Sequence, residues 1–178
     1  MTEREKDCLH EAGHCVVAHA VGKRVTRVHV VHTEAVDVVG RAVLVGGAVE
    51  YTDSRTPMRL QGEAAVRRFA LTCWAGVVIA NDLGVGDDAA EDWAGMARAA
   101  VFLGLTDVDP AQLTDDTSEV HVSVPTDFQN ELDAQCRHIL DERRDEWERL
   151  ARVLDKRSVL SGTEVHRLLS EDWFGICA

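Results

Sequence analysis

Three residues near the amino terminus have the types and the spacing that metal chemistry requires. His10, Glu11 and His14 form the pattern His-Glu-x-x-His. On a helix, side chains four residues apart lie one above the other, so both imidazoles can reach one point. Neutral imidazole is a good zinc ligand, and two imidazoles with a third ligand leave a fourth position open for water. Glu11 lies beside His10, where its carboxylate can take a proton from that water.

A pattern this short also arises by chance, and its histidines could be ordinary polar residues on a helix surface. The residues that flank it are apolar or small, however: Leu9, Ala12, Cys15, Val16 and Val17. They indicate a buried helix, in which two histidines and a carboxylate need partners, and a metal ion is the simplest one. We therefore predict a metal site with His10 and His14 as ligands and Glu11 as the base, an arrangement typical of zinc peptidases.

The third ligand must come from elsewhere in the chain. A helix expected from about Asp87 to Leu103 opens with acidic residues. Asp88 and Asp92 are four apart and share a face, so both are eligible as ligands. Acidic residues also stabilise the first turn of a helix through its dipole, which would explain them without any metal. On the residues alone, both ligands and both explanations stay open.

The elements that position these residues are expected to be mostly helices. A capping box of Thr2 and Glu5 predicts where the helix with the motif begins, and Gly22 predicts its end. Two runs rich in β-branched residues, Val25 to His32 and Val36 to Val45, predict two strands, with Gly40 marking a bend and Gly46 and Gly47 marking an exit. His29 and His32 point to opposite faces of the first run, which favours surface positions over metal ligation.

The rest of the chain predicts a core helix, a loop and a long helix. Gln61 to Leu83 has apolar residues at helical spacing, whereas Leu105 to Val124 is acidic and rich in turn residues. Thr126 to Lys156 predicts one helix of about 45 Å. A capping box at Ser161 predicts a short helix through Leu169. The expected fold class is α+β, mainly helical, with a small sheet next to the helix that carries the motif, in a single domain over residues 1–178.

Composition excludes several classes of function. The 178 residues carry a net charge of -12, which argues against nucleic acid and against anionic membrane surfaces as partners. Five scattered cysteines without a Cys-x-x-Cys pair indicate a reducing compartment. No apolar run approaches 18 residues and the first residues are not a signal peptide, so the expected location is cytoplasmic.

Over most of its length the chain resembles the peptidase domain of the FtsH-type ATP-dependent zinc metalloproteases. The motif at residues 10–14 reads His-Glu-Ala-Gly-His, the form typical of that family, and the segments at 74–78 and 132–169 are similar to two of its later helices. There are departures: Val77 stands where the family has arginine, and Ala80 and Asn81 stand where it has paired glutamates.

The resemblance implies a zincin-like helix bundle with Zn²⁺ as the cofactor. It implies Asp92 as the third ligand, because Ala-Glu-Asp-Trp matches the family's pattern there; alignment on Met96-Ala97-Arg98 would place the ligand near Asp88 instead. The implied function is that of a zinc metallopeptidase, in which Glu11 activates a zinc-bound water to hydrolyse peptides or unfolded proteins. The strand at 36–45 would pair with the extended substrate.

Two further partners and two alternatives follow from the resemblance. The chain contains no Gly-x-x-x-x-Gly-Lys-[Ser/Thr] phosphate loop, so an ATPase would have to be a separate subunit. The family forms rings, which makes a homo-oligomer a further expectation. The alternative function is a non-catalytic, peptidase-like interaction or oligomerisation module. Another is a metal-dependent hydrolase that cleaves a non-peptide amide.

Overall fold

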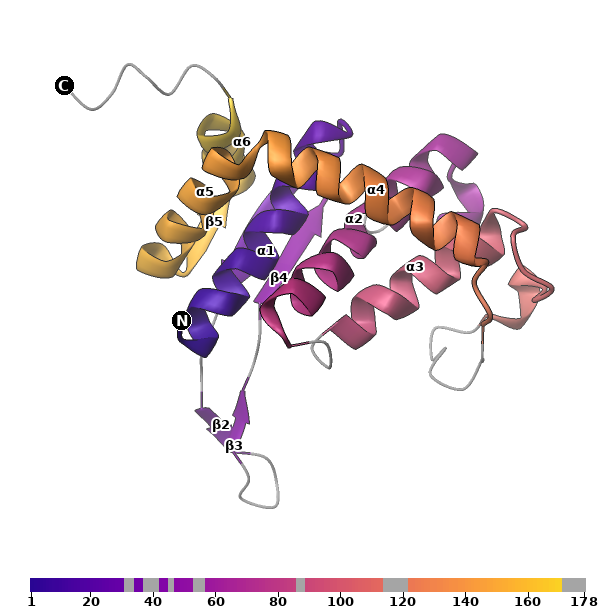
Figure 1. Ribbon diagram of the computed structural model, residues 1–178, viewed down its shortest axis with the longest axis horizontal. Coiled ribbons are helices and arrows are strands. Elements are labelled where there is room, and N and C mark those ends of the chain that lie inside the picture. Colours follow the sequence, from indigo (N-terminus) through magenta and orange to yellow (C-terminus); the bar gives the residue numbers. More distant parts are fainter. Residues whose placement is uncertain are drawn as a thin grey trace. The chain divides into compact units, whose positions relative to one another are not determined.

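The computed structural model describes seven stretches of the chain: residues 1–30, 34–36, 42–44, 47–52, 57–85, 89–113 and 122–170. The chain forms two compact units. Unit 1 comprises residues 1–52 and 143–178, and unit 2 comprises residues 53–142. Within the described stretches there are six α-helices and a small three-stranded antiparallel sheet (Figure 1), which confirms the α+β, mainly helical class.

Unit 1 begins with helix α1, Glu3–Ala20, which carries the histidine motif. The Thr2 side chain accepts a hydrogen bond from the Glu5 backbone N–H, and the Glu5 carboxylate accepts one from the Thr2 N–H, so the predicted capping box is confirmed. Gly22 follows the helix with a φ of 72°, a conformation that glycine adopts without strain. Most of the second half of α1 is buried, as the apolar flanks of the motif predict.

The sheet of unit 1 has the strand order β4-β1-β5. Its central strand β1, Val25–Val30, pairs antiparallel with β4, Gly47–Tyr51, on one side and with β5, Val159–Ser161, on the other. Val28 in the middle of β1 is fully buried, opposite Val49 and Leu160. Strand β1 confirms the first predicted strand up to Val30; residues 31–33, with His32, lie outside the described stretches.

The predicted strand from Val36 to Val45, with its bend at Gly40, is confirmed only in part. Strand β2, Glu34–Val36, ends where that strand was expected to begin, and it pairs antiparallel with β3, Ala42–Leu44, in a separate two-stranded sheet. A run of β-branched residues indicates extended backbone but does not say where the chain reverses. Residues 37–41, 45 and 46 lie outside the described stretches.

Two helices complete unit 1. Helix α5, Arg144–Arg157, packs along α1, and α6, Gly162–Leu169, packs against β1 and α5. The Trp147 indole N–H donates a 2.7 Å hydrogen bond to the Leu9 carbonyl, and Arg4 Nε lies 2.9 Å from Asp155 Oδ1. Helix α1 therefore contacts α5 as well as β1 and β4, and the predicted small sheet does lie next to the motif helix.

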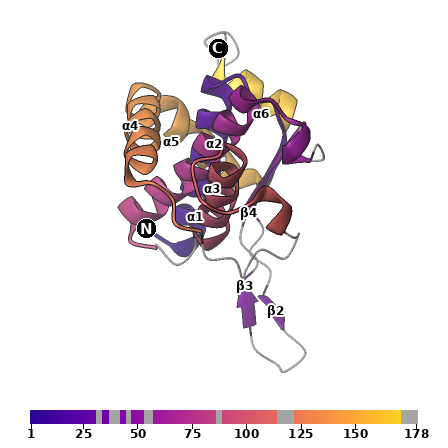
Figure 2. The same cartoon turned by 90° about the vertical axis from the view of Figure 1, so that its right-hand side faces the viewer.

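Unit 2 is built around α2, Glu63–Leu83, which confirms the predicted core helix. It packs against α3, Ala90–Phe102, and α4, Thr126–Glu142 (Figures 1 and 2). Cys136 on α4 donates a hydrogen bond from its buried Sγ to the Leu71 carbonyl on α2 at 3.3 Å. Two short 3-10 helices, η1 at Met58–Leu60 and η3 at Pro110–Gln112, flank α2 and α3; η3 lies within the predicted loop, of which residues 114–121 lie outside the described stretches.

The prediction of one long helix from Thr126 to Lys156 is wrong, because the helix is interrupted at Arg143. This residue has φ −113° and ψ 26°, so α4 ends at Glu142 and α5 begins at Arg144. The Arg143 guanidinium donates hydrogen bonds to the carbonyls of Val16 and Leu169. These contacts stabilise the break, and only the interruption of the apolar stripe at Arg143 hints at it in the sequence.

Two other observations complete the description. The predicted short helix after Ser161 is confirmed as α6, with its capping box formed by Ser161 and Glu164. The apolar tail at Trp173 to Ile176 lies outside the described stretches. None of the described helices combines the length and the apolar character that crossing a membrane requires.

Candidate metal site

The two histidines of the motif are held on the buried part of α1. His14 is only 7 % exposed and His10 is half-buried. The hydrogen bond from Trp147 to Leu9 fastens this stretch of α1 to α5, and the apolar neighbours Val16 and Val17 are fully buried. The imidazoles are therefore carried by a backbone that packing holds in place, which is what a preorganised metal site requires.

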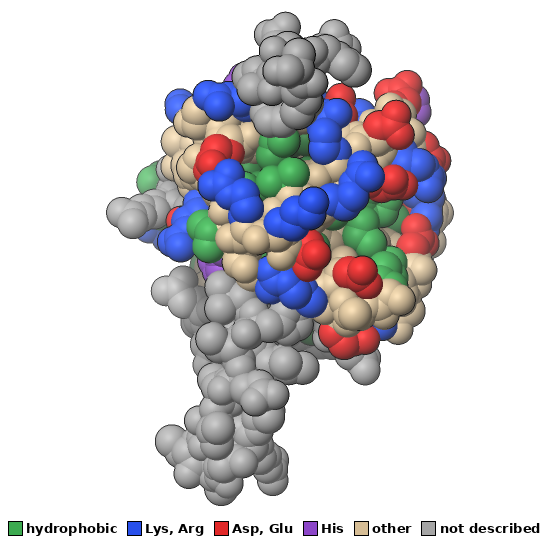
Figure 3. Space-filling view, turned by 90° about the vertical axis from the view of Figure 1, so that its left-hand side faces the viewer, with side chains coloured by type: hydrophobic (Ala, Val, Ile, Leu, Met, Phe, Trp, Pro, Cys, Tyr) green, Lys and Arg blue, Asp and Glu red, His purple; other side chains and the backbone are tan. Residues whose placement is uncertain are grey.

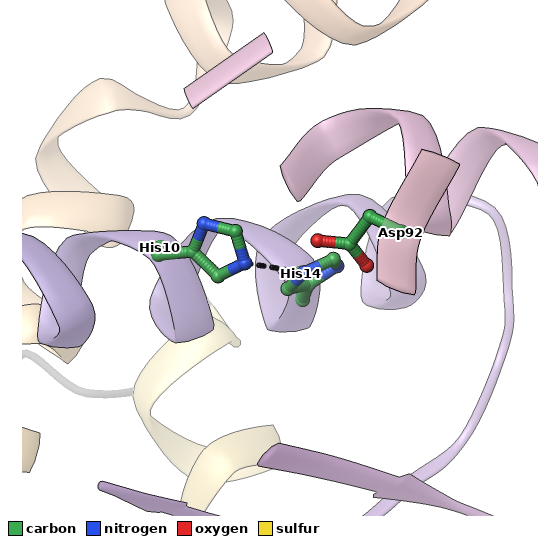
Figure 4. A group of neighbouring side chains, drawn as sticks. All are labelled: His10, His14 and Asp92. Carbon is green, nitrogen blue, oxygen red and sulfur yellow. Dashed lines mark hydrogen bonds between the residues drawn. The ribbon is translucent and has the colours of Figure 1, made fainter. Parts of the chain in front are cut away.

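The imidazoles point toward each other from successive turns of α1 (Figure 4). Their Nε2 atoms lie 3.1 Å apart, and the ring planes meet edge to face at 72°. One ligand atom from each of His10, His14 and Asp92 can be chosen so that all three lie within 4.8 Å of one another. The structure thus brings together the three predicted ligands as a candidate metal-binding group.

Asp92 lies in the first turn of α3, and contacts inside unit 2 fix that turn. The ring of its neighbour Trp93 lies 5.6 Å from the ring of Trp74 on α2. A Cβ on Gly95 would come within 2.8 Å of the Cys73 sulfur, so glycine allows α3 to approach α2 this closely. Asp88, the other candidate ligand, lies outside the described stretches, and His29 is half-buried on β1 and is not part of the group.

Glu11 is buried, with 6 % of its surface exposed, and it faces the first residue of β4. A Cβ built on Gly47 would lie 2.4 Å from Glu11 Cγ and 2.7 Å from Glu11 Oε1. Side-chain atoms never approach that closely, so only glycine leaves room for the Glu11 side chain. In the sequence, Gly46 and Gly47 indicate the exit from a strand, and no local signal points to the contact with Glu11.

The cysteines of α1 do not compete as metal ligands. Burial raises the pKa of the Cys15 thiol well above its ordinary value, and the Glu11 carboxylate raises it further. Burial also raises the pKa of Cys8, to about 11. Neither cysteine belongs to the candidate group, whose donors are two imidazoles and one carboxylate.

The spacing of the two imidazoles fits a zinc ion. Zinc binds imidazole at about 2.0–2.1 Å with tetrahedral geometry, which places two ligand nitrogens about 3.3 Å apart. The 3.1 Å between the two Nε2 atoms is close to that spacing. Two nitrogens and one carboxylate are also the donor types found in catalytic zinc sites. The residues present therefore fit the ion that the sequence predicts.

The chain matches no protein-family model and no curated protein sequence. The arguments for a function therefore come from the motif and from the geometry of the site.

Proposed function

We propose that the chain is a zinc-dependent metallopeptidase of the FtsH type, in which His10, His14 and Asp92 hold Zn²⁺ and Glu11 is the catalytic base. The observation that carries the proposal is the convergence of the three donors within 4.8 Å. The buried Glu11 follows the ligand His10 directly in α1. A purely structural zinc site does not need a carboxylate beside an open position, so Glu11 favours catalysis over a structural role.

The chemistry divides between the ion and the chain. When bound, zinc supplies Lewis acidity, which lowers the pKa of water and polarises a carbonyl oxygen. Glu11 takes the proton from the attacking water and passes it to the leaving amine of the cleaved peptide. The close contact with Gly47 restricts the positions that its carboxylate can take. A base held in one place can act without reorganising during the reaction.

Metal binding must also change the tautomer of the imidazole that donates in this pair. In the 3.1 Å contact between the two Nε2 atoms, one nitrogen donates a hydrogen bond to the other. Metal ligation requires a free lone pair on both Nε2 atoms, so both rings must then be protonated at Nδ1. Loading with zinc should therefore produce a tautomer change that nitrogen NMR can detect without any substrate.

Strand β4 is a better candidate for the substrate-pairing strand than the segment at 36–45. It is the terminal strand in the order β4-β1-β5, so one of its edges has no partner among the described strands. Its first residue, Gly47, contacts Glu11. An extended peptide added to that edge would pass the proposed base, and pairing through the main chain would accept many sequences.

The test combines metal analysis with hydrolysis of an unfolded protein substrate. Wild-type chain should bind one zinc ion and hydrolyse the substrate until a chelator is added. Glu11→Gln should keep the zinc and lose at least about a hundredfold in turnover, because only the base is removed. Asp92→Asn should lose the zinc, whereas Glu91→Gln, its exposed neighbour on α3, should retain both zinc and activity.

Four results would contradict the proposal. Chelator-insensitive hydrolysis would show that the activity does not depend on a metal, and full turnover in Glu11→Gln would remove the base from the mechanism. Loss of zinc in Asp88→Ala but not in Asp92→Asn would identify Asp88, and not Asp92, as the third ligand. Zinc binding without hydrolysis of any peptide would favour the non-catalytic interaction module.

A further inference from the structure

A cavity of about 790 Å³ lies in unit 1, and none of its lining residues belongs to the candidate metal group. Its walls come from the end of α1, the start of β1, Thr52 and the first turn of α6. Sites for small molecules usually measure about 300–1,000 Å³. The cavity is therefore large enough for a small organic molecule, and it is separate from the candidate metal group.

The charge of the lining is opposite to that of the chain. Lys23 and Arg24 line the cavity, and no Asp or Glu does so among the residues that the structure describes. The chain as a whole carries a net charge of -12. A hollow lined by one sign of charge concentrates ligands of the opposite sign, so this cavity favours an anion.

Lys23 is held in a defined position. Its residue is only 8 % exposed, and Nζ lies 4.6 Å from the centre of the Tyr51 ring on β4. The face of an aromatic ring attracts an ammonium group and orients it. A lysine that is already ordered loses little side-chain entropy when it binds a ligand, unlike a lysine that moves freely in solvent.

The first turn of α6 is fixed against β1. A Cβ on Gly162 would lie 2.1 Å from the Val25 carbonyl oxygen, so the helix start is pressed onto the strand. Backbone N–H groups in the first turn of a helix have no acceptor within the helix and carry partial positive charge. The Glu164 carboxylate of this turn is bound to Ser161 and Arg157 and is not among the lining residues.

The two histidines of the lining have defined roles as well. Arg143 Nη1 lies 3.0 Å from His19 Nδ1, and because a guanidinium only donates, Nδ1 must be the acceptor. His19 then carries its proton on Nε2 and donates to His166 Nδ1 at 3.2 Å. Burial, followed by Arg143 and His166, lowers the pKa of His19. The positive charge of the cavity at neutral pH therefore comes mainly from Lys23 and Arg24.

We propose that this cavity binds a small organic anion, whose phosphate or carboxylate group is held by Lys23, Arg24 and the first turn of α6. The side chains of Val25 and Val165 give the walls apolar surface for the body of the molecule. The proposal does not depend on metal binding or on peptide hydrolysis.

Titration followed by NMR tests it on the full chain, at constant pH and ionic strength, with inorganic phosphate in one arm and succinate in the other. We expect saturable shifts of the backbone amide signals of Lys23, Gly162 and Thr163. Tighter binding of phosphate would assign a phosphorylated ligand, and tighter binding of succinate would assign a carboxylate. Shifts that do not saturate in either arm would overturn the proposal.

Two variants and one control locate the anion. Arg24→Gln should weaken binding about tenfold, whereas Arg27→Gln on the following strand β1 should leave it unchanged, because Arg27 does not line the cavity. Thr163→Asp should weaken binding at least as much while leaving the melting temperature unchanged or higher, because an acidic residue suits the first turn of a helix. Equal weakening in Arg24→Gln and Arg27→Gln would mean that the anion responds to general surface charge, and the cavity would be rejected as the site.

Discussion

At the scale of single residues, the proposed chemistry depends most on Glu11, because it alone moves protons. Its contact with Gly47 is closer than the motif itself requires: the side chain occupies the space where any other residue at position 47 would place its Cβ. Gly47 is therefore a positioning residue in this proposal. It is not one of the three candidate ligands, and it limits where the Glu11 carboxylate can lie.

The substitution Gly47→Ala should lower turnover by about a hundredfold, because a displacement of about 1 Å is enough to misplace a catalytic group. Zinc content should stay at the wild-type level, since Gly47 is not one of the three candidate ligands. Metal analysis and the separate measurement of kcat and KM check this result. Ala48→Ser, the next residue on β4, serves as the control. Unchanged kcat in Gly47→Ala would show that the carboxylate does not depend on this contact.

The sequence predicted most of the candidate site at this scale. The spacing of His10 and His14 predicted that their imidazoles meet, because four residues make about one helical turn. The choice between Asp88 and Asp92 could not be made from helical spacing, since both lie on one face of the expected helix. That choice rests on the resemblance: Asp92 belongs to the candidate group found among the described residues, and Asp88 lies outside them. The Gly47 contact joins residues 36 positions apart and has no local signal.

At the scale of elements, the capping box of α6 has a pH-dependent contribution to stability. Hydrogen bonds from the Ser161 backbone and side chain, and then Arg157, lower the pKa of Glu164 to about 2. A carboxyl group with a lowered pKa in the folded state stabilises the fold above its ordinary value of 4.5. That contribution disappears as the pH falls from there towards about 2.

Glu164→Gln should therefore be less stable than wild type at neutral pH, and the difference should shrink as the pH falls below 4.5. Urea unfolding at several pH values measures both free energies. Arg157→Gln is the matched control: it removes only the exposed ion pair, so its smaller effect should vanish in high salt. A difference between wild type and Glu164→Gln that does not change with pH would contradict the argument.

The break between α4 and α5 depends on Arg143, which donates to Val16 of α1 and to Leu169 of α6. Arg143→Met should lower the free energy of unfolding by about 2 kcal/mol, because hydrogen bonds from a charged donor are lost. Arg144→Met, at the exposed neighbouring position, should change it by no more than about 0.5 kcal/mol. Chemical denaturation measures the free energy of unfolding of both variants. Equal decreases in the two would show that Arg143 has no special role in stabilising the break.

The elements that the sequence predicted well have strong end signals. Capping boxes marked the starts of α1 and α6, and Gly84, with φ 70°, marked the end of α2. Short strands such as β5 have too few residues to show the alternation of apolar and polar residues. Strand β5 forms because β1 offers it a pairing partner. The break at Arg143 was missed because one polar residue in an apolar stripe is a weak signal and because the contacts that favour the break are distant in sequence.

At the scale of the whole molecule, zinc should stabilise the fold, because a ligand that binds only the folded state adds to its stability. Free zinc at about a hundred times its dissociation constant adds about 2.7 kcal/mol. For a chain of this length that corresponds to a rise in melting temperature of about 5–10 °C. Scanning calorimetry should show this rise in wild type and in Glu11→Gln, but not in His14→Ala. The same rise in all three would indicate binding elsewhere.

Charge is distributed less evenly than the composition suggests. On the face shown in Figure 3, Lys and Arg side chains gather in a band, although acidic residues outnumber them in the chain. The cationic cavity of unit 1 is a second example. Neither could be predicted from the sequence, because His19, Lys23 and Thr163 come together only when the two ends of the chain fold into one unit.

The composition of unit 1 from both ends of the chain has a consequence for biosynthesis. A ribosome releases α1 and β1 well before their partners α5, β5 and α6, because all of unit 2 lies between them in the chain. Until Arg143 and the residues after it have emerged, the helix that carries His10, Glu11 and His14 lacks the packing that buries it. A nascent chain therefore cannot form the candidate metal site early, and a chain whose translation stops before Arg143 cannot form it at all.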